Sequence, residues 1–178
     1  IWRGTRMTER IVVTGFGMVT PLGIGAEVSW QALRDGQNGV GPIRRFDPSG
    51  FPVRFAAEAH VPGMGPSLKA RLVELALGEA LNQARVPGGD QLGVCVGSEA
   101  ARPPIEWLGR TDVDPEEVAA LAPDVPTLQA MRMSGATGPR STVSTACTSS
   151  SQAIGEAGLR IRRSEEHTSE LQSRQYLV

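Results

Sequence analysis

The chain has 178 residues, enough for one ordinary domain or half of a two-lobed protein, and its 18 cationic and 19 anionic side chains nearly cancel. Since the cations are spread along the chain, we expect neither nucleic acid nor an anionic membrane surface as its main partner. A hydrophobic content of 40% favours a folded globular protein without a membrane span, and the two cysteines indicate a reduced, cytoplasmic location.

The N-terminal end begins with six residues, 1–6, that show no periodicity. Met7 is the natural start, so we interpret residues 1–6 as upstream read-through or a cloning remnant. Arg10–Phe16 is a β-branched run that ends in glycines, and it predicts a buried strand.

Two helices are expected in the first half of the chain. Ala26–Asp35 carries Val28, Trp30 and Leu33 on an apolar side, and Gly36 ends it. Ser67–Arg85 has a broad apolar stripe, and Ser67 is the expected cap. The segment between them is rich in glycine and proline, with short extended pieces near residues 43 and 53–57.

The second half of the chain continues the alternation of strands and helices. We expect strands over Gln91–Gly97 and Ser141–Ala146, a helix over Pro115–Ala122 capped by Asp114, and an amphipathic helix that ends near Arg162. Unbroken apolar runs are typical of parallel strands buried on both faces. The pattern therefore predicts an α/β fold with a mostly parallel sheet and flanking helices.

The C-terminal residues have a different origin in our interpretation. Residues 163–173 can be back-translated into a common sequencing-library adapter, and the apolar stripe of the preceding helix stops there. A solvated helical tail is the alternative. We expect residues 7–162 to form the domain, incomplete at its end, and residues 163–178 to be an artefactual tail.

Cys147 is the candidate nucleophile. It lies between a predicted strand and a helix that opens with hydroxyl residues, where the unpaired amides and the positive end of the helix dipole favour a thiolate. The sharp turn lifts the sulfur out of the sheet edge, and the Cys147 N–H can serve as an oxyanion donor. A small buried hydrophobe is the alternative, and this is our interpretation of Cys95, which lies between valines in a predicted strand.

Three separated segments resemble the β-ketoacyl-acyl-carrier-protein synthases, with synthase II as the most similar subtype. The segment Gly138–Ala157 around Cys147 resembles the active-site signature of that family. Arg10–Gly23 resembles its first strand and loop, and Trp30–Gly39 with Ile43–Asp47 resembles the segments that follow. The resemblance covers residues 9–162. It implies a thiolase-like condensing-enzyme fold, of which this chain carries the N-terminal lobe only.

The resemblance also implies an activity, an acyl transfer in fatty acid biosynthesis. Cys147 would take an acyl chain from acyl carrier protein as a thioester, and decarboxylation of malonyl-carrier protein would supply the carbanion that extends it by two carbons. It implies a homodimer, with no cofactor and no metal. The family's two catalytic histidines and its lysine lie in its second lobe, and His60, His167 and Lys69 do not stand in such motifs. We therefore expect this chain not to complete the condensation.

Alternatives to a fatty acid synthase remain at this stage. A polyketide-type ketosynthase has the same cysteine signature. A non-catalytic partner subunit similar to chain-length factors generally lacks the cysteine that Cys147 matches. The segment from Gly97 to Thr127 differs from the usual synthase II pattern, which leaves the acyl-chain length open. The missing lobe would also leave apolar surface and the edge strand before Cys147 uncovered, so we expect self-association.

Overall fold

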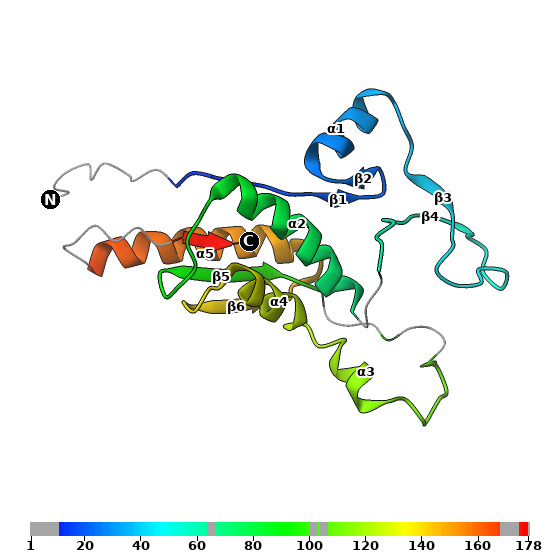
Figure 1. Ribbon diagram of the computed structural model, residues 1–178. Coiled ribbons are helices and arrows are strands. Elements are labelled where there is room, and N and C mark those ends of the chain that lie inside the picture. The colour runs from blue at the N-terminus through cyan, green and yellow to red at the C-terminus, as the bar shows by residue number, and fades with distance from the viewer. Residues whose placement is uncertain (1–10, 64–66, 100–102, 104–106, 168–174, 178) are drawn as a thin grey trace, which may run out of the picture. The chain divides into compact units, whose positions relative to one another are not determined.

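The computed structural model describes residues 11–63, 67–99, 103, 107–167 and 175–177, which form two compact units (Figure 1). One unit is Gly15–Arg85. The other, which we call the sheet unit, consists of residues 11–14 and the described residues from Val86 onward. Among the described residues, no helix is both long enough and apolar enough to cross a bilayer.

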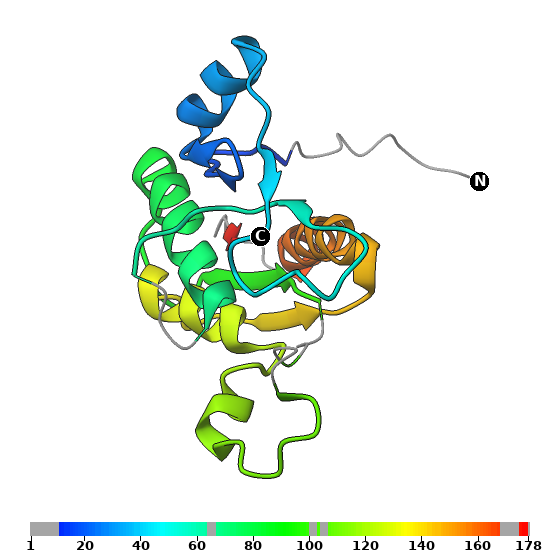
Figure 2. The same ribbon diagram turned by 90° about the vertical axis from the view of Figure 1, so that its right-hand side faces the viewer.

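The sheet unit is built on three parallel strands in the order β6-β5-β7. The central strand is β5 (Leu92–Gly97), with β6 (Arg140–Val143) on one side and β7 (Gln175–Leu177) on the other. The long helix α5 (Ser149–His167) runs beside β5 and β6, the green and gold arrows of Figure 2. The expected strands around residues 91–97 and 141–146 and the parallel sheet are confirmed, although β6 ends before Ala146.

Helices cover both faces of this sheet. Two buried alanines of α5 pack against Cys95 of β5, whose sulfur accepts a hydrogen bond from the Ser141 hydroxyl of β6. The next side chain along β6, Thr142, is hydrogen-bonded at 2.6 Å to Thr127 of α4 (Val125–Ser134). Because successive side chains of a strand point to opposite faces, α4 covers the face opposite α5.

The buried strand expected over residues 10–16 is wrong for the part that is described. Residues 11–16 form no ladder, and Val12 and Val13 are 64% and 84% exposed. A buried strand must pair its backbone amides and carbonyls with neighbours. Both sides of β5 are already occupied, by β6 and β7, so the run has no place beside that strand.

The Gly15–Arg85 unit contains two helices and two short antiparallel ribbons. These elements are β1 (Val19–Thr20), β2 (Gly23–Ile24), α1 (Ala26–Arg34), β3 (Val40–Pro42), β4 (Phe55–Ala57) and α2 (Leu68–Ala84). Both expected helices are confirmed to within one residue. The predicted cap of α2 is confirmed, since the Ser67 hydroxyl accepts the Ala70 N–H at 3.3 Å. Gly36, with φ 70°, follows the end of α1 as expected.

The apolar side expected for α1 is exposed. Val28, Trp30 and Leu33 are each more than half exposed, while Ser29 and Ala32 are the buried residues of this helix. Ser29 is buried because its hydroxyl lies 2.9 Å from that of Thr20 and 3.3 Å from the Gly23 carbonyl oxygen. The inner face of α1 is therefore polar and small, and the large apolar side chains point away from it.

Two helices lie between β5 and β6 along the chain. The expected helix after Asp114 is α3 (Pro115–Ala119), shorter than predicted, and the Asp114 carboxylate caps it by accepting the Glu116 N–H at 2.8 Å. The helix α4 was not predicted, although Pro126 in its first turn is a usual helix-start signal. Residues 100–102 and 104–106 of the atypical segment lie outside the described residues.

The C-terminal helix is longer than expected. It was predicted to end near Arg162, whereas α5 continues to His167, and the short strand β7 follows in the sheet. The assignment of residues 1–6 and 163–178 to foreign sequence stays a prediction.

Candidate active site around Cys147

Cys147 lies at the junction of a strand and a helix in the sheet unit. The strand β6 ends at Val143, the 3₁₀ turn η2 (Ala146–Thr148) follows, and α5 begins directly at Ser149. Cys147 is the middle residue of η2 and is exposed. The junction therefore places the thiol beside the amides at the start of α5, where the helix dipole has its positive end.

The turn before Cys147 is strained. Ala146 has φ 52°, in the left-handed region, and within the described residues Arg85 is the other non-glycine residue with a positive φ. A left-handed conformation costs an alanine about 1 kcal/mol or more, so it persists only where surrounding contacts impose it. Strained residues of this kind are frequent next to reacting groups, where they fix a side chain in one direction.

Hydrogen bonds from two hydroxyls hold this turn. The Ser149 hydroxyl accepts the Thr145 N–H at 2.9 Å and donates to the Ala146 carbonyl at 2.8 Å. The Thr148 hydroxyl donates to the Thr145 carbonyl at 3.0 Å and accepts a hydrogen bond from Gln152 at 3.2 Å. Ser149 is 4% exposed, whereas Thr148 is at the surface. Hydrogen bonds thus hold the turn on both its buried side and its exposed side.

Gly97 allows the first turn of α5 to lie on the end of β5. A Cβ at this position would lie 2.5 Å from the Ser149 carbonyl carbon and from the Ser150 nitrogen. Both are backbone atoms, which side-chain rotation does not move. The absence of a side chain at Gly97 therefore sets how closely the helix that follows Cys147 approaches the sheet.

The other thiol, Cys95, is confirmed as a buried core residue. It is 0% exposed and packs against α5. Burial raises the pKa of the Cys95 thiol, and the hydrogen bond from Ser141 at 3.1 Å opposes that change. A buried thiol that is kept protonated is a poor nucleophile. Only Cys147 of the two thiols combines exposure with a helix start.

The remaining residues named from the sequence lie in other elements of the chain. His60 is exposed in the loop after β4, and Lys69 lies on the first turn of α2; both belong to the Gly15–Arg85 unit. His167 is the last residue of α5. Within the part of the chain that the structure describes, no three histidine, cysteine or carboxylate side chains gather as a metal site would need.

Comparison with known proteins identifies the family of this chain. Residues 8–168 match the family described as Beta-ketoacyl synthase, N-terminal domain. The chain belongs to the β-ketoacyl synthases. Its fold is the α/β fold of that N-terminal domain, as the sequence motifs predicted.

Individual relatives of this β-ketoacyl synthase chain come from two kinds of pathway. It is 33% identical over 180 residues to a polyketide beta-ketoacyl synthase from Streptomyces cyaneus, covering 85% of this chain and 42% of that protein. It is 30% identical over 172 residues to 3-oxoacyl-(acyl-carrier-protein) synthase 2 from Synechocystis, covering 84% and 41%. The solved ishigamide ketosynthase/chain length factor superposes with a TM-score of 0.73 at 26% identity, covering 87% and 44%. The chain therefore spans less than half the length of these relatives.

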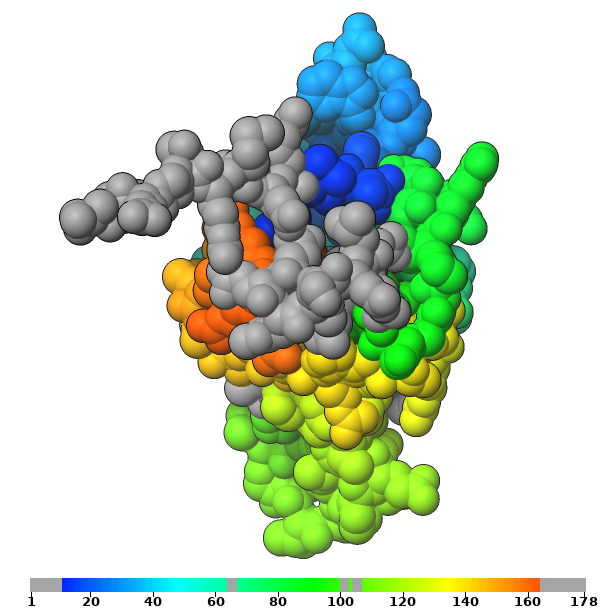
Figure 3. All heavy atoms as spheres, turned by 90° about the vertical axis from the view of Figure 1, so that its left-hand side faces the viewer, coloured from blue at the N-terminus to red at the C-terminus, as the bar shows by residue number. Residues whose placement is uncertain are grey.

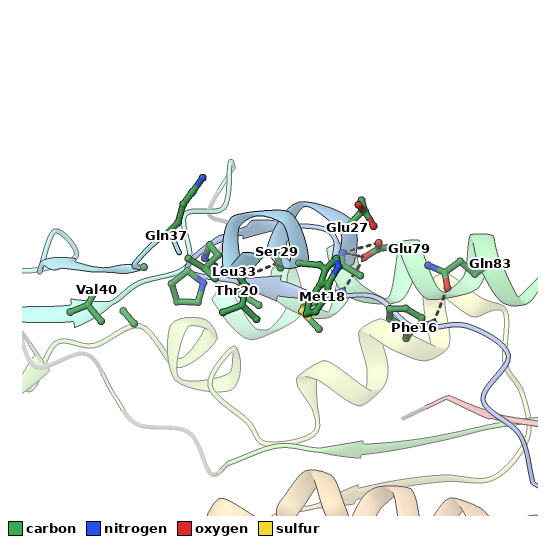
Figure 4. Close-up of a pocket in the computed structure, with 16 residues that line it drawn as sticks. Phe16, Met18, Thr20, Glu27, Ser29, Leu33, Gln37, Val40, Glu79 and Gln83 are labelled. Carbon is green, nitrogen blue, oxygen red and sulfur yellow. Dashed lines mark hydrogen bonds between the residues drawn. The ribbon is translucent and has the colours of Figure 1, made fainter. Parts of the chain in front are cut away.

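A cavity of the synthase chain lies in the Gly15–Arg85 unit. It has a volume of about 770 Å³, and its walls are mainly apolar (Figure 4). Its lining residues include Phe16, Met18, Trp30, Leu33 and Glu79. Cys147 belongs to the sheet unit and does not line this cavity.

Glu79 is a structural residue of this unit that sequence reasoning missed. Its carboxylate accepts the Met18 N–H at 3.0 Å and the Ala26 N–H at 2.9 and 3.1 Å, and Gln83 accepts the Phe16 N–H at 3.2 Å (Figure 4). Glu79 thus caps α1 from α2, where a helix start favours negative charge. A signal was present, because Glu79 lies at helical spacing on the face of the apolar Leu75.

Proposed function

We propose that this chain is part of a condensing enzyme that extends acyl chains by two carbons, with Cys147 as its nucleophile. The observation that carries the proposal is the exposed thiol on a strained turn at the start of α5. The family of the chain supports it, since β-ketoacyl synthases form a carbon–carbon bond from two thioesters. The activity of the whole enzyme is proposed from a chain that spans less than half of its relatives.

The first half-reaction is the one for which this chain holds a nucleophile. The Cys147 thiolate attacks the carbonyl carbon of an acyl thioester, and the carbonyl oxygen becomes an oxyanion. The Cys147 N–H at the turn is the proposed donor to that oxyanion. When the tetrahedral intermediate collapses, the carrier thiolate leaves, takes up a proton, and the acyl chain remains on the Cys147 sulfur.

The second half-reaction needs groups that we do not assign to this chain. Malonyl-carrier protein must lose carbon dioxide, and its carbanion must attack the acyl-cysteine while the cysteine thiolate leaves. In the family two histidines and a lysine assist these steps. His60 and Lys69 do not stand in motifs that resemble the catalytic ones of the family, so we assign them no part in these steps. We propose that the chain stops at the acyl-cysteine.

Fatty acid elongation of the synthase II type is the pathway we propose, in the cytoplasm, with acyl carrier protein as partner and a homodimer as the assembly. The name of the Synechocystis relative includes acyl-carrier protein, which supports this partner. A polyketide ketosynthase is the second candidate, favoured by the 33% identity with the Streptomyces cyaneus protein. A non-catalytic chain-length partner is disfavoured because Cys147 is present.

Acyl transfer tests this proposal directly. The purified chain is incubated with octanoyl-carrier protein and then digested for mass spectrometry. We expect the octanoyl mass on the Cys147 peptide and not on the Cys95 peptide, and we expect Cys147→Ala to abolish it. Failure of Cys147 to become acylated, while iodoacetamide labels it readily, would contradict its role as the nucleophile.

The stop at the acyl-cysteine is tested by a second addition. With malonyl-carrier protein present, we expect the octanoyl group to stay on Cys147 and no ten-carbon β-ketoacyl product to form. Formation of that product by the purified chain would show that the condensation groups are present after all.

A further inference from the structure

The left-handed conformation of Ala146 needs a restraint, and the structure contains one side chain that bonds on both sides of it. Ser149 accepts a hydrogen bond from the N–H of Thr145, the residue before Ala146, and donates one to the carbonyl of Ala146 itself. The Thr145 N–H belongs to the peptide that joins residues 144 and 145, and the Ala146 carbonyl belongs to the peptide that joins Ala146 to Cys147. A single oxygen therefore holds the peptide before Thr145 and the peptide after Ala146. Rotation of Ala146 toward a right-handed or extended backbone would break one or both of these bonds.

The acceptor bond of Ser149 runs in an unusual direction for a serine at a helix start. Such a serine ordinarily accepts an N–H of the second or third residue ahead of it. The Ser149 oxygen instead accepts the Thr145 N–H, four residues back along the chain. Its hydrogen bonds therefore serve the turn that carries Cys147, and they do not direct its oxygen at the amides of the first turn of α5.

The burial of Ser149 makes its two hydrogen bonds important for the conformation of the turn. Ser149 is 4% exposed and lies beside the backbone contact with Gly97, whereas the neighbouring Ser150 and Ser151 side chains are exposed. Water does not readily replace a buried hydroxyl, so its loss leaves the Thr145 N–H without this partner. The outer hydroxyl, Thr148, donates to the Thr145 carbonyl, in the peptide that precedes Ala146, and among the described residues it makes no bond to the Ala146 carbonyl that would replace the bond of Ser149.

We propose that Ser149 is a positioning residue, whose hydroxyl holds Ala146 in the left-handed conformation and thereby fixes the Cys147 sulfur at the start of α5. The inference rests on the proposed function, in which that sulfur is the nucleophile. Ser149 itself touches no reacting atom. It acts through the backbone of Ala146, so its removal changes the reactivity of Cys147 without unfolding the sheet beneath.

The test measures alkylation of both thiols in the same molecule as a function of pH. In each reaction the thiolate sulfur displaces iodide from iodoacetamide and forms a carbon–sulfur bond, which peptide mass spectrometry assigns to Cys147 or Cys95. The variants are Ser149→Ala, Ser149→Thr, which keeps the hydroxyl, and the matched control Ser151→Ala, which makes the same change at an exposed position of α5.

We expect Ser149→Ala to lower the Cys147 alkylation rate at neutral pH about tenfold and to change the shape of the rate–pH curve. Ser149→Thr restores most of the rate, and Ser151→Ala changes it less than twofold. Cys95 stays unlabelled in every variant, which shows that the core is intact.

Three results would overturn the inference. These are an unchanged Cys147 rate and profile in Ser149→Ala, a Ser149→Thr variant as slow as Ser149→Ala, and labelling of Cys95 in Ser149→Ala at the rate of Cys147. A different result would contradict the proposed function. In that case Cys147 of the unmodified chain would react with iodoacetamide at neutral pH no faster than a free thiol.

Discussion

The two thiols of this chain show how position decides the chemistry of one residue type. Cys95 is fully buried in the central strand, and Cys147 is exposed in the turn before α5. Their neighbours in the sequence already differ, since valines flank Cys95 and hydroxyl residues follow Cys147. The burial of Cys95 could therefore be predicted from its strand, and the exposure of Cys147 from its junction.

The buried Cys95 thiol makes the free energy of unfolding depend on pH in the alkaline range. Burial raises the pKa of Cys95 in the folded chain above its ordinary value. Below the ordinary value, the thiol is protonated in both states and contributes no pH dependence. As the pH rises above it, the unfolded chain loses the proton first, so unfolding becomes easier until the pH reaches the folded pKa. We expect the free energy of unfolding to fall by at most about 1.4 kcal/mol per pH unit within this window.

Urea unfolding of dilute protein between neutral pH and pH of about 10 measures this slope, above the ordinary thiol pKa of about 8.5. Cys95→Ala is expected to be less stable at neutral pH, because it leaves a small cavity, and to show a shallower alkaline slope. Equal slopes for Cys95→Ala and the unmodified chain would contradict the assignment to Cys95.

At the scale of elements, the site depends on how α5 meets the end of β5. Gly97→Ala would place a Cβ 2.5 Å from backbone atoms of Ser149 and Ser150, so the helix start must move away from the sheet. Overpacking of this kind costs roughly 1–3 kcal/mol. We expect Gly97→Ala to lower the free energy of unfolding in urea by that amount and to slow Cys147 alkylation, since the same movement displaces the turn.

A second glycine provides the control for this prediction. Gly155 lies on α5, and nothing within 4 Å would meet a Cβ there. Gly155→Ala should raise the free energy of unfolding by up to about 1 kcal/mol, because alanine is the better helix former. If Gly97→Ala were as stable as the unmodified chain, the close approach of β5 and α5 would not be a determinant of the site.

Elements that form from local sequence patterns could be predicted, and strands that need a neighbouring strand could not. The apolar stripe and Ser67 predicted α2, and the β-branched run predicted β5. The run over residues 10–16 is also rich in β-branched residues, as β5 is, yet its described residues 11–16 form no ladder, because a strand needs a neighbouring strand to pair its backbone groups. The composition of a run does not reveal whether a neighbouring strand will be available to pair with it.

The candidate site likewise has one feature that the sequence predicted and one that it did not. The position of Cys147 between a strand and a helix followed from the sequence, because strand and helix patterns meet there. The left-handed Ala146 did not follow, since alanine has no preference for that conformation and takes it here with the hydrogen bonds of Ser149. A strained residue held by a neighbour is visible only in the folded chain.

At the scale of the whole molecule, the chain exposes apolar and backbone groups that most folded proteins cover. Ile154 and Leu159 of α5 are 62% and 53% exposed, and later turns of this helix reach the surface in Figure 3. Trp30 and Leu33 of α1 are 54% and 58% exposed. The strand β6 is an edge strand of the described sheet, with β5 as its neighbour. Large apolar patches and open edges are the usual sites of association.

We therefore expect the purified chain to associate as its concentration rises. Sedimentation velocity should give an average mass above 18.9 kDa that increases with concentration. Ile154→Glu removes an apolar side chain whose burial is worth about 1.5–3 kcal/mol, so association should need roughly ten- to a hundredfold more protein. Val118→Glu makes the same kind of change on α3, where the side chain is 52% exposed, and should leave association unchanged. A single monomeric species over the whole concentration range would contradict this expectation.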